Sequence, residues 1–204
     1  MTEKLARTII PLYDEHAAAW ERLRPTTLFE RPWLDRFLQL TPANAQLLDL
    51  GCGNGAPIAA YFIEQGHRVT GIDGAQAMIA RCRQRFPQQE WRQMDMRQLD
   101  LATRFDGLLA WDSFFHLARD DQRRMFPLFR QHANPHAALM FTSGPADGVA
   151  IGSFEGQPLF HASLAPEEYR RLLQENGFRV VDHIVEDPAC GGRTIWLAQS
   201  GAEE

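Results

Sequence analysis

A glycine-rich turn follows an apolar segment in the first third of the chain. Residues 47–50 are mostly leucine, and Gly51, Gly53 and Gly55 alternate directly after them. Alternating glycines let a backbone turn sharply and approach a ligand closely, and the free N–H groups of the helix that follows then face that ligand. About one helix later a second apolar segment ends at Asp73, a spacing typical of a carboxylate that binds a ribose diol. The pattern predicts a nucleoside-binding strand–helix–strand unit.

The spacing of this turn indicates which nucleoside is bound. A dinucleotide site has the pattern G-x-G-x-x-G, whereas here the third glycine, Gly55, comes one residue earlier. Asp49 adds negative charge beside the turn, which disfavours a pyrophosphate and suits a ligand with a cationic centre. The chain also lacks the phosphate loop G-x-x-x-x-G-K-[ST], and its single lysine is Lys4. A nicotinamide oxidoreductase is therefore disfavoured.

The order of these residues resembles that of a known enzyme family. The stretch from Asp49 to Gly55, then Asp73, then Met94-Asp95-Met96 resembles the class I S-adenosylmethionine-dependent methyltransferases of the small-molecule type. The resemblance extends over residues 45–198. It implies an α/β fold with a doubly wound, mostly parallel seven-stranded sheet of the Rossmann-like methyltransferase type and N-terminal lid helices. It also implies S-adenosylmethionine as the cofactor and S-adenosylhomocysteine as the product.

The resemblance also implies a set of cofactor-binding residues. Asp49 would orient the loop and favour the ligand's ammonium group, and Asp73 would accept hydrogen bonds from both ribose hydroxyls. Asp95 could accept one from the adenine amino group, with Asp100 as the alternative carboxylate. Trp111 follows the fourth strand, where the family contacts the methionine end, although it and Met78 could instead be core residues. The expected cofactor-binding residues are Asp49, Gly51, Gly53, Gly55, Asp73, Met78, Asp95, Met96 and Trp111.

The acceptor pocket is expected in the loops beyond the later strands and in the N-terminal helix. Segment 111–116 is aromatic enough to hold a flat or apolar acceptor. Asp112 and His116 are four residues apart, so one helical turn would put them on one face as a proton relay. His116 and His161 are the candidate general bases, although His116 could simply be structural. The expected substrate-binding residues are Tyr13, Trp20, Phe115 and His161.

Other polar residues are less informative. Methyl transfer from a sulfonium depends largely on positioning and on excluding water, so a dedicated catalytic residue need not exist. Three residues near the same rim could recognise a charged acceptor or be structural, namely Asp187, Cys190 and Arg193. The remaining histidines have no evident partner and are expected to be solvated or capping residues, namely His67, His132, His136 and His183.

Missing motifs narrow the acceptor. After the fourth strand there is no [DN]-P-P-[YFW], and the chain has no Pro-Cys pair, so methylation of nucleic-acid bases is disfavoured. A net charge of −5 and scattered arginines also argue against nucleic acid and anionic membranes as partners. Asp112, Asp120 and Asp121 do not have the spacing of a magnesium site, so no metal is expected. A small-molecule acceptor attacking through N or O remains, with a protein or tRNA methyltransferase, or a nonenzymatic S-adenosylmethionine-binding protein, as alternatives.

The length and composition of the chain indicate how many domains it forms. A chain of 204 residues with 45% hydrophobic and 23% charged residues is typical of one globular domain. We expect a single methyltransferase domain with an N-terminal helical cap (1–44), a cofactor-binding half (45–144), and an acceptor-side loop, helix and closing hairpin (145–204). The three cysteines lack metal-site spacing and the N-terminus lacks a long apolar segment. A reduced, cytoplasmic protein without a membrane span is therefore expected, and its oligomeric state cannot be predicted.

The hydrophobic periodicity predicts the elements that position these residues. Amphipathic helices are expected over 9–24 and 32–40, and from residue 45 strands and helices alternate, which favours a parallel sheet. Segment 143–163 is polar and glycine-rich, and is either a functional loop or a short extra hairpin. In the resembled family the final strand is antiparallel, which the hairpin-type turn before it would allow. The predicted strands are 46–50, 68–72, 90–94, 105–111, 137–142, 178–186 and 193–198, and the later helices are 56–65, 75–85, 120–133 and 166–176.

Overall fold

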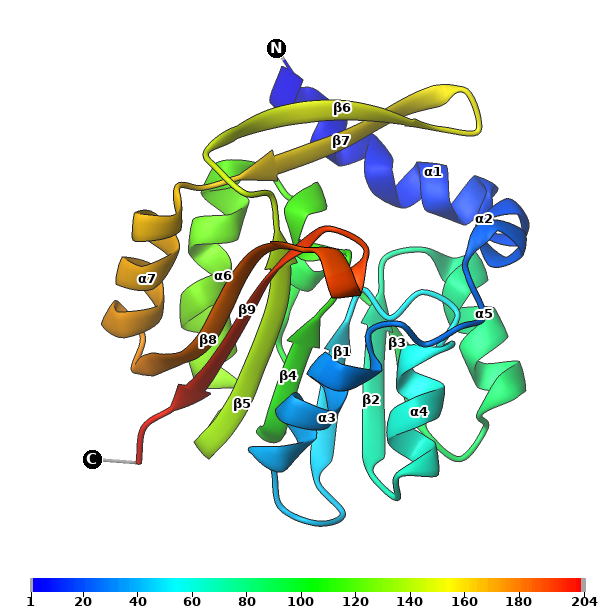
Figure 1. The fold of residues 1–204 in the computed structure, drawn as a ribbon. Helices are drawn as coiled ribbons and strands as arrows, with labels where there is room; N and C mark the ends of the chain where they lie inside the picture. Colours follow the sequence, from blue (N-terminus) through cyan, green and yellow to red (C-terminus); the bar gives the residue numbers. More distant parts are fainter. Residues whose placement is uncertain (1, 203–204) are drawn as a thin grey trace.

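A computed structural model describes residues 2–202 and contains the expected seven-stranded sheet. Its strands are β1 (Gln46–Leu50), β2 (Arg68–Asp73), β3 (Glu90–Gln93), β4 (Phe105–Ala110), β5 (Ala133–Ser143), β8 (Phe178–Asp187) and β9 (Arg193–Ser200). The strand order is β3-β2-β1-β4-β5-β9-β8. Strands β1 to β5 pair in parallel, whereas β9 runs antiparallel to both of its neighbours (Figure 1). The predicted fold class, including the antiparallel final strand, is confirmed.

Two helical layers cover the sheet because the apolar side chains of its strands alternate between the two faces. In β1, Leu48 packs into a cluster with Phe126, while its neighbour Leu47 packs on the other side with Phe37 and Phe62. Fully burying a side chain of this size stabilises the fold by roughly 1.5–3 kcal/mol, and a slip by one residue would turn each set toward the face that is packed for the other. The covering helices are α6 (Arg119–Gln131) and α7 (Pro166–Glu175) on one face, and α3 (Arg31–Gln39), α4 (Ile58–Glu64) and α5 (Gln76–Arg85) on the other.

The N-terminal segment differs from the prediction. The single helix expected over 9–24 is wrong, because the structure has the 3-10 helix η1 (Thr2–Thr8) followed by α1 (Ile9–Glu15) and α2 (Ala17–Leu23). The break is at His16, whose φ of −107° and ψ of 22° are not helical. The new direction lets Glu21 accept hydrogen bonds from Asn54, Arg81 and Arg85 at 3.1, 3.2 and 2.6 Å. Contacts with distant parts of the chain therefore override the local helical periodicity.

The long segment after β5 forms a hairpin. Strands β6 (Gly148–Phe154) and β7 (Gln157–Ser163) pair antiparallel as a separate two-stranded sheet. Glu155 and Gly156 connect them with φ values of +48° and +74°, the left-handed conformation that a tight hairpin turn requires. The hairpin alternative for 143–163 is thus confirmed. Figure 1 shows the hairpin crossing above the carboxyl-terminal edge of the sheet, next to α1.

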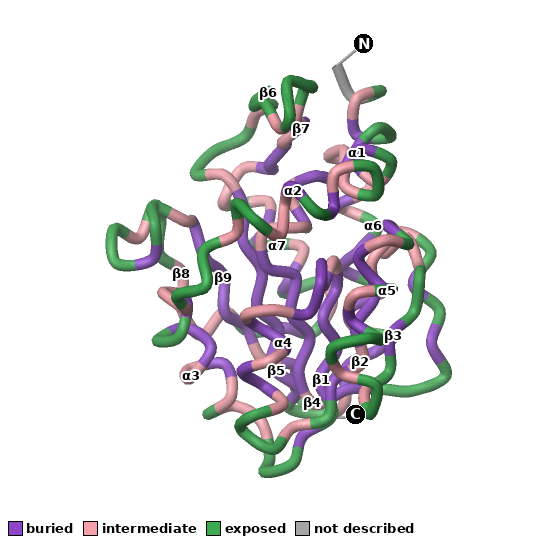
Figure 2. The backbone as a smooth tube through the Cα atoms, turned by 90° about the vertical axis from the view of Figure 1, so that its right-hand side faces the viewer, coloured by how far each residue is buried: buried purple, intermediate pink, exposed green. Residues whose placement is uncertain are grey.

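The turns that follow the parallel strands therefore lie together beneath α1 and the β6–β7 hairpin (Figure 1). Buried backbone concentrates in the sheet, while the hairpin is largely exposed at its outer side (Figure 2). Three short 3-10 helices lie in the connections, namely η2 (Met96–Gln98), η3 (Phe114–His116) and η4 (Pro188–Cys190). Among residues 2–202, no helix has the length and apolar character needed to cross a membrane.

Candidate active site

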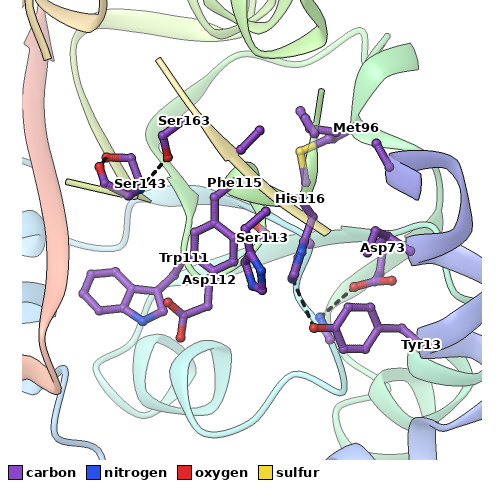
Figure 3. A pocket seen from close by; sticks show the side chains of 18 of the residues that line it. Tyr13, Asp73, Met96, Trp111, Asp112, Ser113, Phe115, His116, Ser143 and Ser163 are labelled. Carbon is purple, nitrogen blue, oxygen red and sulfur yellow. Dashed lines mark hydrogen bonds between the residues drawn. The ribbon is translucent and has the colours of Figure 1, made fainter. Parts of the chain in front are cut away.

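A cavity of about 790 Å³ lies at the edge of the sheet where β1, β2 and β4 end. It is lined by the turn after β1, by η3 and the turn before β9, and from above by α1 and the β6–β7 hairpin. The volume falls in the range of cofactor and substrate sites, roughly 300–1,000 Å³. Figure 3 shows side chains from these elements pointing into one space. The predicted site residues that line it are Tyr13, Trp20, Asp49, Gly51, Gly53, Asp73, Met78, Asp95, Met96, Trp111, Phe115, His116 and His161.

The turn after β1 requires glycine at two positions. Gly51 has a φ of +77°, and a Cβ there would lie 2.4 Å from the Cβ of Ser113. Ser113 is itself held by a hydrogen bond of 2.6 Å that it donates to the carbonyl of Leu50. Gly53 has a φ of +55°, and its Cβ would lie 3.1 Å from the indole ring of Trp20. The turn therefore presents its backbone to the cavity, with Trp20 of the N-terminal helices packed against it.

Gly55 lies apart from the other two glycines. Its φ of +79° is also left-handed, but a Cβ there would meet the Sγ of Cys82 at 3.3 Å and the ring of Phe86 at 3.4 Å. These side chains lie behind the turn rather than in the cavity. Gly55 therefore does not line the cavity. It shapes the turn from the side that faces away from the cavity.

Two carboxylates, the buried Asp49 and the half-buried Asp73, face the cavity from the ends of β1 and β2. Burial raises the pKa of Asp49 to about 7, assisted by the charge of Asp73 and opposed by Arg24. Asp73 accepts hydrogen bonds of 2.9 Å from the backbone N–H groups of Gly53 and Ala75. Burial raises the pKa of Asp73 despite these two bonds. A ligand that brings a cation or hydroxyl donors would offset the cost of keeping these groups buried.

The third predicted carboxylate is already paired. Asp95 accepts hydrogen bonds from the guanidinium of Arg97, with Nε at 3.0 Å from both carboxylate oxygens. Although burial opposes ionisation, these bonds hold the pKa of Asp95 below its usual value. Asp95 lines the cavity beside Met96, whereas the alternative carboxylate, Asp100, does not. Any contact between Asp95 and a ligand is thus made by a carboxylate fixed in place by Arg97.

His116 is bonded through both ring nitrogens. Its Nδ1 lies 2.7 Å from the carbonyl of Phe160 in β7 and its Nε2 lies 3.1 Å from the hydroxyl of Tyr13 in α1 (Figure 3). A carbonyl can only accept, so Nδ1 carries the proton and Nε2 accepts from Tyr13. Burial lowers the pKa of His116 to about 3, helped by the neighbouring His161 and opposed by the Phe160 carbonyl. Burial and the charges of Asp112 and Asp73 raise the pKa of Tyr13 above its usual value.

His161 has a different environment. Its ring is half-buried in the cavity wall, 4.8 Å from the ring of His116 and 5.0 Å from that of Phe115 between centroids. Burial lowers the pKa of His161, opposed by the main chain of Leu159 and Ala150 and by the charge of Asp112. Burial therefore favours the neutral form of His161, whereas the charge of Asp112 favours its protonated form.

The expected relay between Asp112 and His116 is not formed. Asp112 has a φ of +48°, so no helical turn joins the two residues. Its carboxylate instead accepts hydrogen bonds of 2.7–2.9 Å from Arg193 and lies 3.8 Å from Arg24. Arg24 in turn donates a bond of 2.6 Å to Glu30, which is completely buried. The sequence did not predict Arg24 as a site residue. It predicted only that Arg193 lies near the edge of the sheet where the acceptor pocket is expected.

The structure shows a property of Trp111 that its position in the sequence did not predict. The residue is 4% exposed, lines the cavity, and its indole Nε1 is buried without a hydrogen-bond partner. An unpaired buried donor costs about 1–3 kcal/mol, and a ligand acceptor would remove this cost. Arg24 and Trp111 thus add two donors to the part of the cavity that contains Asp49.

Several of the other polar residues are structural. Of the four histidines predicted to be solvated or capping, His132 is a capping residue: it is the C-terminal cap of α6, although it is completely buried. It accepts a bond of 3.0 Å from Leu101 N and donates one of 2.8 Å to the carbonyl of Leu128. Asp187 accepts a bond of 2.8 Å from Trp33, and burial raises the pKa of Cys190 to about 12. Stabilising roles therefore account for these residues.

No group of three His, Cys, Asp or Glu side chains in the described range 2–202 is arranged to hold a metal ion. The cavity instead gathers one glycine turn, the carboxylates of Asp49 and Asp73 and a guanidinium at one end, and aromatic rings with one half-buried imidazole at the other. The first end suits a nucleoside with a zwitterionic group, and the second can accept a proton from a ligand beside it.

Sequence comparisons identify relatives with one kind of activity. A family profile described as "Methyltransferase domain" matches residues 47–136. The chain is 28% identical over 200 residues to an O-methyltransferase of Pyrenophora dematioidea, covering 86% of this chain and 73% of that protein. It is 33% identical over 180 residues to a trans-aconitate 2-methyltransferase of Azoarcus sp., covering 77% of this chain and 68% of that protein.

Solved structures share the fold. A 1,6-didemethyltoxoflavin-N1-methyltransferase of Burkholderia thailandensis, with its acceptor and S-adenosylhomocysteine bound, matches with a TM-score of 0.73 at 24% identity, covering 97% of this chain and 87% of that one. An amino pentose methyltransferase of Micromonospora echinaspora with S-adenosylmethionine bound matches with a TM-score of 0.71 at 21% identity, covering 91% of this chain and 96% of that one. At these identities the likeness concerns the fold.

Proposed function

Because the chain belongs to the class I S-adenosylmethionine-dependent methyltransferases, we propose that it transfers a methyl group to an oxygen or nitrogen atom of a small-molecule acceptor. One observation carries the proposal: the glycine turn, Asp49, Asp73 and Asp95 follow successive strands and face a single cavity. The named acceptors of related proteins, trans-aconitate among them, are small molecules. A net charge of −5 gives no support to nucleic acid as the acceptor.

The residues of the cavity fit this cofactor. Gly51 and Gly53 line the cavity without side chains, so a ligand can approach the backbone of the turn closely. Trp111 Nε1 is a buried donor without a partner. Asp49 would bind the ammonium group of the methionine end, and Arg24 with Trp111 Nε1 would bind its carboxylate. When bound, the cofactor supplies an electrophilic methyl carbon on a sulfonium.

The nucleoside portion would lie on the other side of the glycine turn. Asp73 is fixed by two backbone bonds and has lone pairs left to accept from the ribose hydroxyls. Met78 and Met96 offer polarisable surfaces to the adenine ring. Asp95, held by Arg97, would accept from the adenine amino group.

We assign the general base to His161 rather than to His116. Both nitrogens of His116 are already bonded, and its low pKa leaves it unable to take a proton near neutral pH. Instead, His116 holds Tyr13 and the hairpin over the cavity, which excludes water from the reaction. Burial favours the neutral form of His161, which lies in the wall that an acceptor would touch.

The cofactor site is tested by calorimetric titration with S-adenosylhomocysteine. Saturable binding is expected, and Asp73→Ala should weaken it by roughly tenfold or more because a charge-assisted hydrogen bond contributes about 1.5–3 kcal/mol. Asp100→Ala is the matched control, since Asp100 is an exposed carboxylate outside the cavity lining. No saturable binding to the wild-type protein, or equal affinities for the two variants, would refute the assignment.

We also propose that the chain acts as one domain in a reducing compartment such as the cytoplasm. All three cysteines are free, buried thiols, which suits a compartment where disulfides do not form. Denaturation profiles that are identical with and without a reductant would support this, and a reductant-sensitive profile would argue against it.

A further inference from the structure

We propose that the acceptor is an uncharged, planar aromatic or heteroaromatic molecule that is methylated on a ring hydroxyl. The inference rests on the proposed function and deepens it by naming the substrate class. It follows from what lines the acceptor end of the cavity, which lies beneath the β6–β7 hairpin and beside η3.

Rings form one wall of this region. Phe115 and His161 are 5.0 Å apart between centroids, and His116 lies 4.9 Å from Phe115 and 4.8 Å from His161. Tyr13 extends the wall, 5.5 Å from His116. All four residues line the cavity, and Figure 3 shows Phe115 between Trp111 and His116. Ring pairs at 4.5–7 Å are attractive beyond the area they bury, so a further flat ring is the shape this wall favours.

The cations of the lining are already engaged. Arg193 makes three hydrogen bonds to Asp112 and Arg97 is bonded to Asp95, and the proposed function assigns Arg24, which is bonded to Glu30, to the carboxylate of the cofactor. These are the arginines among the described residues that line the cavity. An acceptor with several carboxylates would have to displace Asp112 or Asp95 and leave that half-buried carboxylate without its partner, which is unfavourable. Among the described residues, the cavity thus offers no unengaged guanidinium to a polycarboxylate acceptor such as trans-aconitate.

The same reasoning applies to cationic acceptors. The charge of one carboxylate of the lining, Asp112, acts on both Tyr13 and His161 of the ring wall. Its negative charge is balanced by Arg193 and, at 3.8 Å, by Arg24. Asp49 and Asp73 lie at the cofactor end and are used there. An ammonium group on the acceptor would therefore find no unpaired partner, and a neutral acceptor is favoured.

A hydroxyl group on the acceptor would supply the attacking oxygen atom and the proton that is transferred. The acceptor oxygen forms a bond to the methyl carbon, the carbon–sulfur bond breaks with its electron pair remaining on sulfur, and the hydroxyl proton passes to His161. Asp112 faces the imidazolium that results. A phenol-type hydroxyl, with a pKa near 10, is far more acidic than an aliphatic alcohol, so a neutral imidazole assists its reaction more readily.

The test measures equilibrium binding of matched probes to the protein saturated with S-adenosylhomocysteine, followed by ligand-detected NMR. The probes are 2-naphthol, its saturated analogue decahydro-2-naphthol, its anionic analogue 2-naphthoate, its cationic analogue 2-(aminomethyl)naphthalene, and trans-aconitate. We expect 2-naphthol to bind more tightly than any other probe. With S-adenosylmethionine in place of the product, 2-naphthol should yield its methyl ether.

A variant isolates the ring wall. Phe115→Leu keeps an apolar side chain but removes the ring, and should weaken 2-naphthol binding roughly two- to tenfold. The matched control, Leu23→Ala, alters an exposed residue outside the lining and should leave the affinity unchanged. Equal affinity for the saturated analogue, tighter binding of a charged probe, or no binding of 2-naphthol would overturn this inference. Loss of S-adenosylhomocysteine binding would instead overturn the proposed function.

Discussion

The affinity for S-adenosylhomocysteine should decrease as the pH is lowered through 7. In the free protein, burial and the charge of Asp73 raise the pKa of Asp49 to about 7, so its carboxyl group is half protonated at that pH. A bound ammonium group favours the ionised carboxylate. Binding therefore lowers this pKa and releases protons, and protonation at lower pH competes with the ligand.

The magnitude follows from the titration of one group. For a pKa of about 7, the ionised fraction of Asp49 falls from one half at pH 7 to roughly one eleventh at pH 6. The affinity should then fall by about fivefold, or about 1 kcal/mol. The α-amino group of the ligand belongs to a free amino acid, so its pKa lies above the value of about 7.7–8.0 that is typical of a peptide N-terminus. The affinity should be highest between pH 7 and that pKa, and should decrease again once the ammonium group loses its proton.

Isothermal titration calorimetry at a series of pH values measures this profile. Near pH 7, titrations in two buffers of different ionisation enthalpy should report the release of about half a proton per ligand. Asp49→Asn should bind more weakly and lose the decrease below pH 7. The comparison ligand is 5′-deoxy-5′-methylthioadenosine, which lacks the amino-acid end and should show a flat profile. If the affinity of Asp49→Asn for S-adenosylhomocysteine still decreased below pH 7, the role assigned to the Asp49 carboxylate would be refuted.

Three further predictions concern single side chains. Arg24→Gln should weaken binding of S-adenosylhomocysteine by roughly tenfold or more while sparing methylthioadenosine, because only the first ligand has a carboxylate for the guanidinium; equal losses in calorimetry would contradict this. His116→Phe removes the bonds to Tyr13 and the hairpin, so hydrogen exchange measured by mass spectrometry should accelerate in both α1 and β7, and unchanged exchange would contradict it. His132→Ala removes a buried ring with two backbone bonds and should lower the free energy of unfolding by about 2–4 kcal/mol in urea denaturation, whereas a loss below about 1 kcal/mol would indicate a solvated residue.

The features that the sequence predicted are those set by local chemistry. The turn at Gly51 must be glycine because of its left-handed φ and the close approach of Ser113, so its composition is visible in the sequence. Alternating apolar strands and helices limit the fold to a parallel sheet, and parallel strands end at one edge. The position of Asp73 after the second strand then predicts that it faces the same cavity as the turn.

The features that could not be predicted depend on partners far along the chain. The helix break at His16 follows from contacts that Glu21 makes with residues 33 to 64 positions away. Arg24 gains its place beside the cavity from Glu30 and Asp112, and periodicity indicates only that a helix ends there. The apparent relay spacing of Asp112 and His116 was misleading because it assumed a helix that the backbone at Asp112 does not form.

The two neighbouring histidines illustrate why a residue type at the right place does not define its role. His116 and His161 are 4.8 Å apart between ring centroids, and sequence reasoning made both of them candidate bases. Protonating His116 near pH 7 would cost about 5 kcal/mol, because its pKa is lowered to about 3 and its Nε2 already accepts from Tyr13. His161 is half-buried and faces Asp112, so its protonation is opposed by burial but favoured by a nearby charge. Environments that separate two like groups separate their functions: the buried imidazole of His116 holds the cover in place, and the half-buried imidazole of His161 is left to accept a proton.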